Sequence, residues 1–174
     1  MNFIRIGDKL IDKDRIDAKI SEILQMRARG ASQQEVADKL GLDRSFVSRL
    51  ENVGEIRRGG KIALIGFPIG NKDEVCDMAR QEGVEFVLLL NDKERWDFLR
   101  NRSGIELFND IGQLVSRVRE FDTVILLGSD KRVRFMAGLL DNETIQIPIG
   151  VSPIEGDVYV NVEELRKTIR ELLG

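Results

Sequence analysis

Residues 32–51 read SQQEVADKLGLDRSFVSRLE, and this stretch decides the fold of the N-terminal part of the chain. Ser32 and Glu35 have the spacing of a capping box, in which each side chain accepts a hydrogen bond from the backbone N–H of the other residue. Gly41 suits the left-handed backbone conformation that ends a helix, and Asp43 is a typical cap for the start of the next helix. The stretch therefore predicts two short helices joined by a tight turn.

A small apolar core is predicted under these two helices. Ala37 falls where they cross, and a larger side chain there would push their axes apart. The other inward-facing residues are Val36, Leu40, Leu42, Val47 and Leu50. A preceding helix is predicted from Asp14, as its N-cap, to about Ala28, and Gly30 stops it. Its apolar residues, at the spacing of one helix face, are Ile16, Ile20, Ile23 and Leu24.

The quoted stretch resembles the helix-turn-helix of the phage repressor/Cro-like (XRE) regulators, and the resemblance extends more loosely over the preceding helix. It implies that the helix beginning at Arg44 enters the major groove of DNA and that the helix beginning after Ser32 crosses the backbone. That family usually has two further helices after this pair, whereas here Arg57-Arg58-Gly59-Gly60 leads directly into an apolar run. We therefore expect a minimal three-helix head, with dimerisation located elsewhere in the chain.

The outward positions of the third predicted helix carry DNA-binding chemistry. An arginine side chain can bond guanine O6 and N7 together, and a serine hydroxyl can reach base edges or phosphates. Gln33 lies in the first turn of the second helix, where its amide and the positive helix end can meet a phosphate oxygen. Arginines of the linker can add non-specific phosphate contacts. The predicted DNA-binding residues are Gln33, Arg44, Ser45, Ser48, Arg49, Arg57 and Arg58.

Two alternatives stay open for this surface. The head can be a three-helix module that uses its polar face for protein contacts. Each arginine can also be a phosphate contact or a solvated side chain rather than a base contact. Phe46 is unusual, because this outward-leaning position normally holds a small residue, and we expect its ring to pack.

Composition excludes several classes of catalytic and metal site. The chain of 174 residues has no histidine and a single cysteine, Cys76. Ser-His and Cys-His catalysis, His-based metal sites, Cys-rich zinc modules and an intrachain disulfide are therefore excluded. Cys76 and Trp96 fit core packing, and no carboxylate pair stands out for acid–base chemistry. We therefore expect no catalytic residue, no metal and no cofactor, and predict that the protein is not an enzyme.

The distribution of charge and the length of the apolar runs indicate the partners of the protein and its cellular compartment. Residues 1–60 contain 12 Lys and Arg against 10 Asp and Glu, whereas the remainder contains 15 against 20. A slightly basic head on an acidic body is a mild sign that the head has an anionic partner. Apolar runs such as 86–90 are too short to cross a bilayer, and the N-terminus has no signal-peptide pattern. We expect a cytoplasmic protein with no membrane partner.

From residue 61 onward, apolar runs alternate with helical patterns. Strands are predicted near 61–66, 84–90, 123–128 and 144–147, and shorter ones near 105–108 and 157–160. Helices are predicted near 72–81, 93–100, 111–119, 132–139 and 162–172, with Asn71 and Asn161 as caps. Strands separated by helices are typical of βαβ units. We predict an α/β protein with an all-α helix-turn-helix domain over 1–58 and a Rossmann-like domain with a mostly parallel sheet over 59–174. Residues 1–11 are expected to form a small hairpin around Gly7-Asp8.

Loops at the carboxyl ends of parallel strands are where open α/β folds bind ligands. Gly66 and Gly70 flank bulky residues, so they match neither a dinucleotide fingerprint nor a Walker loop, and ordinary turn glycines remain the alternative. The junction 128–132 can hold a phosphate or carboxylate at a helix start, and a solvated loop is the alternative that the pattern favours. The residues of this candidate effector site are Gly66, Gly70, Asn71, Asn91, Asp92, Gly128 and Ser129.

Together these features predict a sequence-specific DNA-binding transcriptional regulator. One recognition helix contacts only a few base pairs, so we expect a homodimer on a palindromic double-stranded operator with half-sites about 34 Å apart. The α/β domain is expected to supply dimerisation, effector binding or both, with a small anion as the effector. The alternatives are an α/β enzyme or a protein-interaction module that carries an appended helix-turn-helix head.

Overall fold

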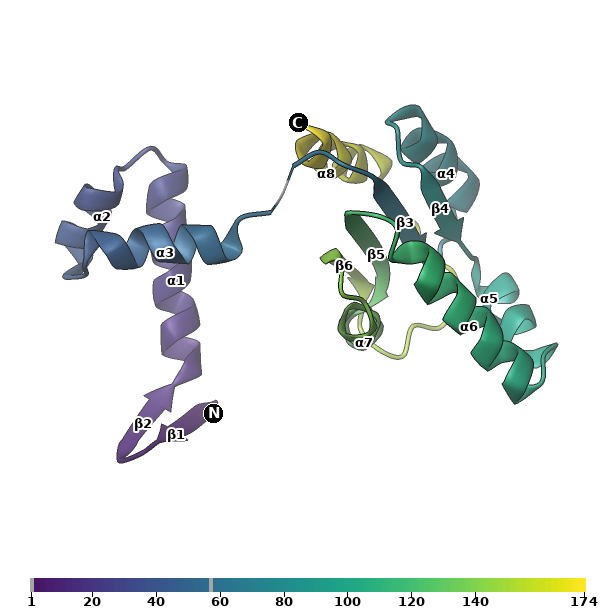
Figure 1. Ribbon diagram of the computed structural model, residues 1–174, viewed down its shortest axis with the longest axis horizontal. Helices are drawn as coiled ribbons and strands as arrows, with labels where there is room; N and C mark the ends of the chain where they lie inside the picture. The colour runs from purple at the N-terminus through teal and green to yellow at the C-terminus, as the bar shows by residue number, and fades with distance from the viewer. Residues whose placement is uncertain (1, 57) are drawn as a thin grey trace. The chain divides into compact units, whose positions relative to one another are not determined.

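A computed structural model describes residues 2–56 and 58–174 (Figure 1). The chain is a mixed α/β protein whose larger part contains a four-stranded parallel sheet. Its internal contacts divide it into two compact units, Met1–Glu55 and Ile56–Gly174. We call the first unit the head and the second the body, and describe each by itself.

The head begins with the expected hairpin. Strand β1 (Phe3–Ile6) pairs antiparallel with β2 (Lys9–Asp12), and the two-residue turn between them is Gly7-Asp8. Every side chain of β1 is exposed. The hairpin therefore adds no buried apolar side chain to the core of the head.

Three helices follow, and together they enclose a small apolar core. They are α1 (Lys13–Ala28), α2 (Gln33–Leu40) and α3 (Arg44–Gly54). The fully buried core residues are Ile23, Val36, Ala37 and Val47. The expected α1 stripe is wrong in part, because Ile16 and Leu24 are 45% and 44% exposed. The core engages Ile23 and Met26 near the C-terminal end of α1, because α2 and α3 are shorter and pack only there (Figure 1).

Local hydrogen bonds explain where these helices begin and end. Ser32 and Glu35 form the expected capping box, and Gly41 ends α2 in the left-handed conformation with φ 65°. One cap prediction is wrong. Asp12 rather than Asp14 caps α1, because the hairpin ends at Asp12 and its carboxylate accepts the Arg15 N–H. Asp43 is the N-cap of α3 as predicted, although its side chain makes no capping bond.

The body is built on the predicted parallel sheet. Its strands are β3 (Ile62–Gly66), β4 (Phe86–Leu89), β5 (Thr123–Ser129) and β6 (Glu143–Gly150). They are ordered β4-β3-β5-β6, and every pairing is parallel. The two central strands, β3 and β5, are buried on both faces. This burial explains their continuous apolar sequences, which are typical of parallel strands covered by helices on each side.

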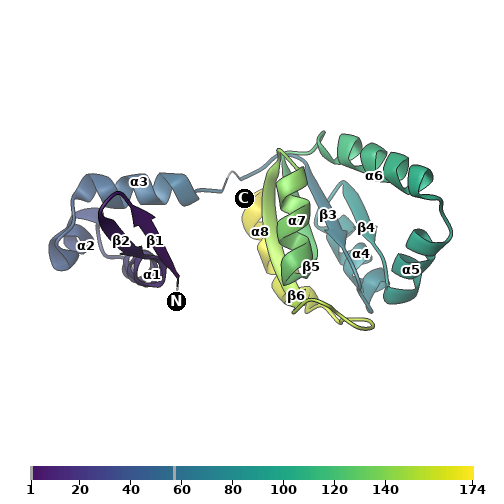
Figure 2. The same ribbon diagram turned by 90° about the horizontal axis from the view of Figure 1, so that it is seen from below.

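Helices cover both faces of this sheet (Figure 2). Residues of α4 (Lys72–Gln81) and α8 (Val162–Leu173) pack on one face against Leu64 and Leu127. On the other face α6 (Gly104–Val118) and α7 (Asp130–Leu139) contribute Val118 and Val133 to a second core. Helix α5 (Asp92–Arg100) follows β4. The chain leaves β3 toward one face and β5 toward the other, so their carboxyl ends form the switch point of the sheet.

Two body predictions are wrong. The expected strand at 105–108 is the first turn of α6, because Ser103 and Glu106 form a capping box that starts a helix there. The expected strand at 157–160 is reduced to one bridge between Ile69 and Val158. Asn71 is the N-cap of α4 as predicted, but its side chain makes no capping bond, because both ends of its amide bond the backbone of Val160.

Candidate functional site

The outer side of α3 presents three of the residues expected to contact DNA. Arg44, Ser45 and Arg49 are exposed, and Ser48 is half-buried. On the inner side of the same helix, Val47 is fully buried and Leu50 packs on the core of the head. Neither Arg44 nor Arg49 forms an ion pair with any residue that the structure describes. Both guanidinium groups are therefore available to an external anion.

Gln33 is committed to a contact inside the head. Its side-chain amide donates to Glu51 at 2.8 Å, and Arg27 donates to the other oxygen of the same carboxylate. These two bonds lower the pKa of Glu51, and the bond from Arg27 has the larger effect, followed by the bond from Gln33. The carboxylate joins α1, α2 and α3, and it uses one of the two N–H donors of the Gln33 amide.

The remaining predictions for DNA binding concern the two linker arginines and Phe46 near the start of α3. Arg58 is exposed, whereas Arg57 lies outside the residues that the structure describes. The ring of Phe46 is 47% exposed, so the packing expected for it is only partial. The outer face of α3 thus combines two cations, hydroxyls and one aromatic ring.

The residues of the candidate effector site gather at the carboxyl edge of the sheet, but most have structural contacts there. A side chain at Gly66 would collide with Leu127, and one at Gly70 would lie 2.9 Å from the Tyr159 ring. Asn91 caps α5 through a bond to the Glu94 N–H. Ser129 is buried beside Ser152, and Gly128 packs near Val133. Together with Asn71, bonded to Val160, these groups shape the edge more than they offer free ligand bonds.

Two arginines near Asp92, at the same edge of the sheet, are not among the site residues predicted from the sequence. The Asp92 carboxylate accepts from Arg95, whose side chain is buried. Arg132, in the first turn of α7, lies within electrostatic range of both. The junction at 128–132 signalled an anion site at this helix start, but nothing in the local pattern around Arg95 distinguishes it from an ordinary exposed helix arginine.

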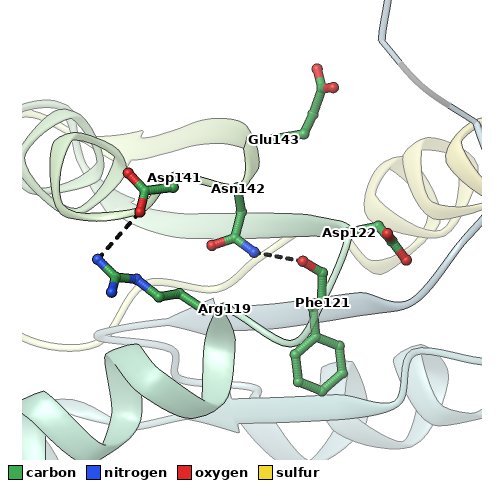
Figure 3. A pocket seen from close by; sticks show the side chains of 6 residues that line it. All are labelled: Arg119, Phe121, Asp122, Asp141, Asn142 and Glu143. Atoms are coloured by element: carbon green, nitrogen blue, oxygen red, sulfur yellow. Dashed lines mark hydrogen bonds and ion pairs between the residues drawn. The ribbon is translucent and has the colours of Figure 1, made fainter.

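A separate hollow of about 730 Å³ lies at the opposite, amino edge of the sheet (Figure 3). It is lined by Arg119, Phe121, Asp122, Asp141, Asn142 and Glu143. Its single cation, Arg119, pairs with Asp141 at 3.3 Å, and Asp122 accepts the backbone N–H of Lys61. The lining is acidic, and Arg119, Asp141 and Asp122 already have partners. This edge is also not where open parallel sheets bind ligands, so we do not assign the hollow a ligand.

Other site classes find no support in the described part of the chain. Residues 2–56 and 58–174 contain no group of three or more acidic or cysteine side chains placed to hold a metal ion. No helix among them is both long and apolar enough to cross a bilayer. Cys76 is a half-buried free thiol.

Searches against family models, curated proteins and solved structures found no match to this chain.

Proposed function

We propose that the protein is a sequence-specific DNA-binding transcriptional regulator whose helices α2 and α3 form a helix-turn-helix. The main observation behind the proposal is that one side of α3 is apolar and buried, whereas the other side is cationic and exposed. Val47 is fully buried on one side, while Arg44 and Arg49 are exposed and unpaired on the other among described residues. An α-helix fits the major groove, and an arginine there can bond guanine O6 and N7 together.

The fixed geometry of the head supports this proposal. Glu51 holds α1, α2 and α3 together through Arg27 and Gln33, and the left-handed Gly41 sets the turn between α2 and α3. Side chains that read bases must keep their positions relative to the backbone-contacting helix, because phosphate contacts set the register of the base contacts. A rigid α2–α3 pair meets that requirement.

Selection of bound sequences from a random pool of double-stranded DNA tests this function. We expect the full-length protein to enrich a palindromic sequence and to bind it less tightly as salt rises. Arg44→Ala should cost about 1–3 kcal/mol of binding free energy and relax the preference at one half-site position. The matched control is Arg15→Ala, since Arg15 is exposed on α1, away from the outer face of α3. No enriched sequence, or equal effects of the two substitutions, would contradict the proposal.

We also propose that the regulator is a homodimer that pairs through α6 of the body. Ile105 and Phe108 on this helix are 76% and 78% exposed, and Ile111 is exposed beside them. The α6 segment is acidic near its start, at Glu106 and Asp110, and basic near its end, at Arg117. An antiparallel second copy of α6 would cover these apolar residues, with Ile105 opposite Ile111 and Phe108 opposite its own counterpart, and Asp110 is already paired with Arg102 inside the chain.

Sedimentation measurements separate this pairing from its alternatives. The wild-type chain should sediment as a dimer of 19.8 kDa subunits, and Phe108→Glu should sediment as a monomer. Phe135→Glu is the matched control, because Phe135 is a similarly exposed phenylalanine on α7. A monomeric wild-type chain, or a dimer that survives Phe108→Glu, would refute pairing through α6.

A further inference from the structure

A buried arginine without a full set of partners lies at the carboxyl edge of the sheet. Arg95 is only 5% exposed. Its Nη2 donates to the Asp92 carboxylate, whereas Nε and Nη1 have no hydrogen-bond partner among the described residues. A guanidinium group has five N–H donors, and leaving charged donors unpaired in a buried place is costly. These unpaired donors point to a ligand that accepts hydrogen bonds.

A second arginine faces the same place. Arg132 is half-buried on α7. Burial lowers the pKa of its guanidinium group, and the positive charge of Arg95 lowers it further, while Asp92 opposes the change. Two carboxylates lie beside these cations: Asp92 accepts from Arg95, and Asp157 accepts the backbone N–H of Asp92 at 2.6 Å. Neither carboxylate accepts from Nε or Nη1 of Arg95.

Aromatic rings border this cluster. The Arg132 guanidinium lies 5.9 Å from the centre of the Phe67 ring, and that of Arg95 lies 5.1 Å from the centre of the Trp96 ring. Rings at these distances favour a positive charge without supplying a counter-charge. They hold the arginines in place and leave their N–H groups for another acceptor.

The cluster lies where the topology of the sheet favours a ligand. Phe67 follows β3, Arg95 lies on the helix after β4, and Arg132 lies on the helix after β5. These three strands are adjacent in the order β4-β3-β5, and the switch point falls between β3 and β5. Crevices beyond the carboxyl ends of strands at such a point are the usual ligand sites of open α/β sheets.

We propose that Arg95 and Arg132 bind the phosphate group of a small phosphorylated metabolite at this edge of the sheet. A phosphate dianion accepts paired bonds from a guanidinium group and would accept from the Arg95 donors that have no partner among the described residues. The burial of Arg95 favours a small molecule over the backbone of a nucleic acid. Phosphate binding at this site does not depend on DNA binding by the head, so the two proposals can be tested separately.

Trp96 provides a direct test, because it is the only tryptophan and its ring lies beside Arg95. Inorganic phosphate and glycerol phosphate are titrated into the full-length chain while Trp96 fluorescence and the melting temperature are followed. We expect a saturable fluorescence change and a rise in melting temperature, because a ligand that binds only the folded state stabilises it.

Three substitutions make the test specific. Arg95→Gln and Arg132→Gln should each weaken phosphate binding at least about tenfold, the effect expected for losing a charged hydrogen bond. Arg100→Gln is the matched control, since the exposed Arg100 lies 5.0 Å from the same Trp96 ring and should leave the titration unchanged. Circular dichroism checks the fold of each variant, and Arg132→Gln decides the question if Arg95→Gln does not fold.

Several results would overturn the assignment. The absence of a saturable response to either phosphate compound would reject the site. Equal responses in Arg132→Gln and Arg100→Gln would show that phosphate binds elsewhere. A response to succinate but not to phosphate would reject phosphate as the ligand group.

Discussion

The turn between α2 and α3 allows a prediction in which only the backbone conformation is tested. Gly41 has φ 65° and ψ 39°, and a Cβ added there would meet no atom within 4 Å. Gly41→Ala therefore causes no collision, and its cost is that of placing an L-residue in the left-handed region, about 1–2 kcal/mol. We expect the head to lose that much stability.

Gly54→Ala is the matched control for this prediction. Gly54 ends α3 with equally open space around it but without a positive φ, so alanine should be neutral or stabilise the helix by up to about 1 kcal/mol. Hydrogen exchange of the α2 and α3 amides in the full-length chain measures both effects, because Trp96 reports on the body alone. A loss of 1.4 kcal/mol corresponds to about tenfold faster exchange. Unchanged or slower exchange in Gly41→Ala would refute the reasoning.

Two further predictions concern packing and pH. Ala37→Leu should destabilise the head by about 1–3 kcal/mol, measured by the same amide exchange, because Ala37 is fully buried between the helices and has no room for a larger side chain. Bonds from Arg170 and then Arg166 lower the pKa of Glu82 to about 2. The ionised Glu82 links α4 to α8, and the stability that this link contributes should be fully present above pH 4.5 and lost as pH falls toward 2. Acid unfolding followed by Trp96 fluorescence should show this loss of stability in the wild type but not in Glu82→Gln.

Features set by neighbouring residues were predictable from the sequence. The capping box of Ser32 and Glu35 and the bounds of α4, Lys72–Gln81, were predicted as observed. Capping bonds join residues three apart, so their chemistry is visible in a short stretch of sequence. The central strands were also predictable, because burial on both faces requires continuous apolar runs such as residues 62–65.

Features set by distant contacts were not predictable. An apolar run as short as 105–108 fits a strand or a helix equally well, and the Ser103 cap decides for a helix. The exposed Ile16 has the spacing of a core residue, but α1 enters the core of the head only through Ile23 and Met26. Arg95 could not be identified because arginine is usually exposed, and its burial depends on how α5 packs.

The order of strands in the body has a consequence for how the protein is made. The adjacent strands β3 and β5 pair residue 62 with residue 123, so the sheet cannot form until a long segment has been synthesised and its closure entropy overcome. The buried core of the head is formed by residues between Ile23 and Val47, within a much shorter stretch of chain. The head can therefore acquire its native structure on the ribosome before β5 leaves the exit tunnel, and the surface of α3 is ready before the body has folded.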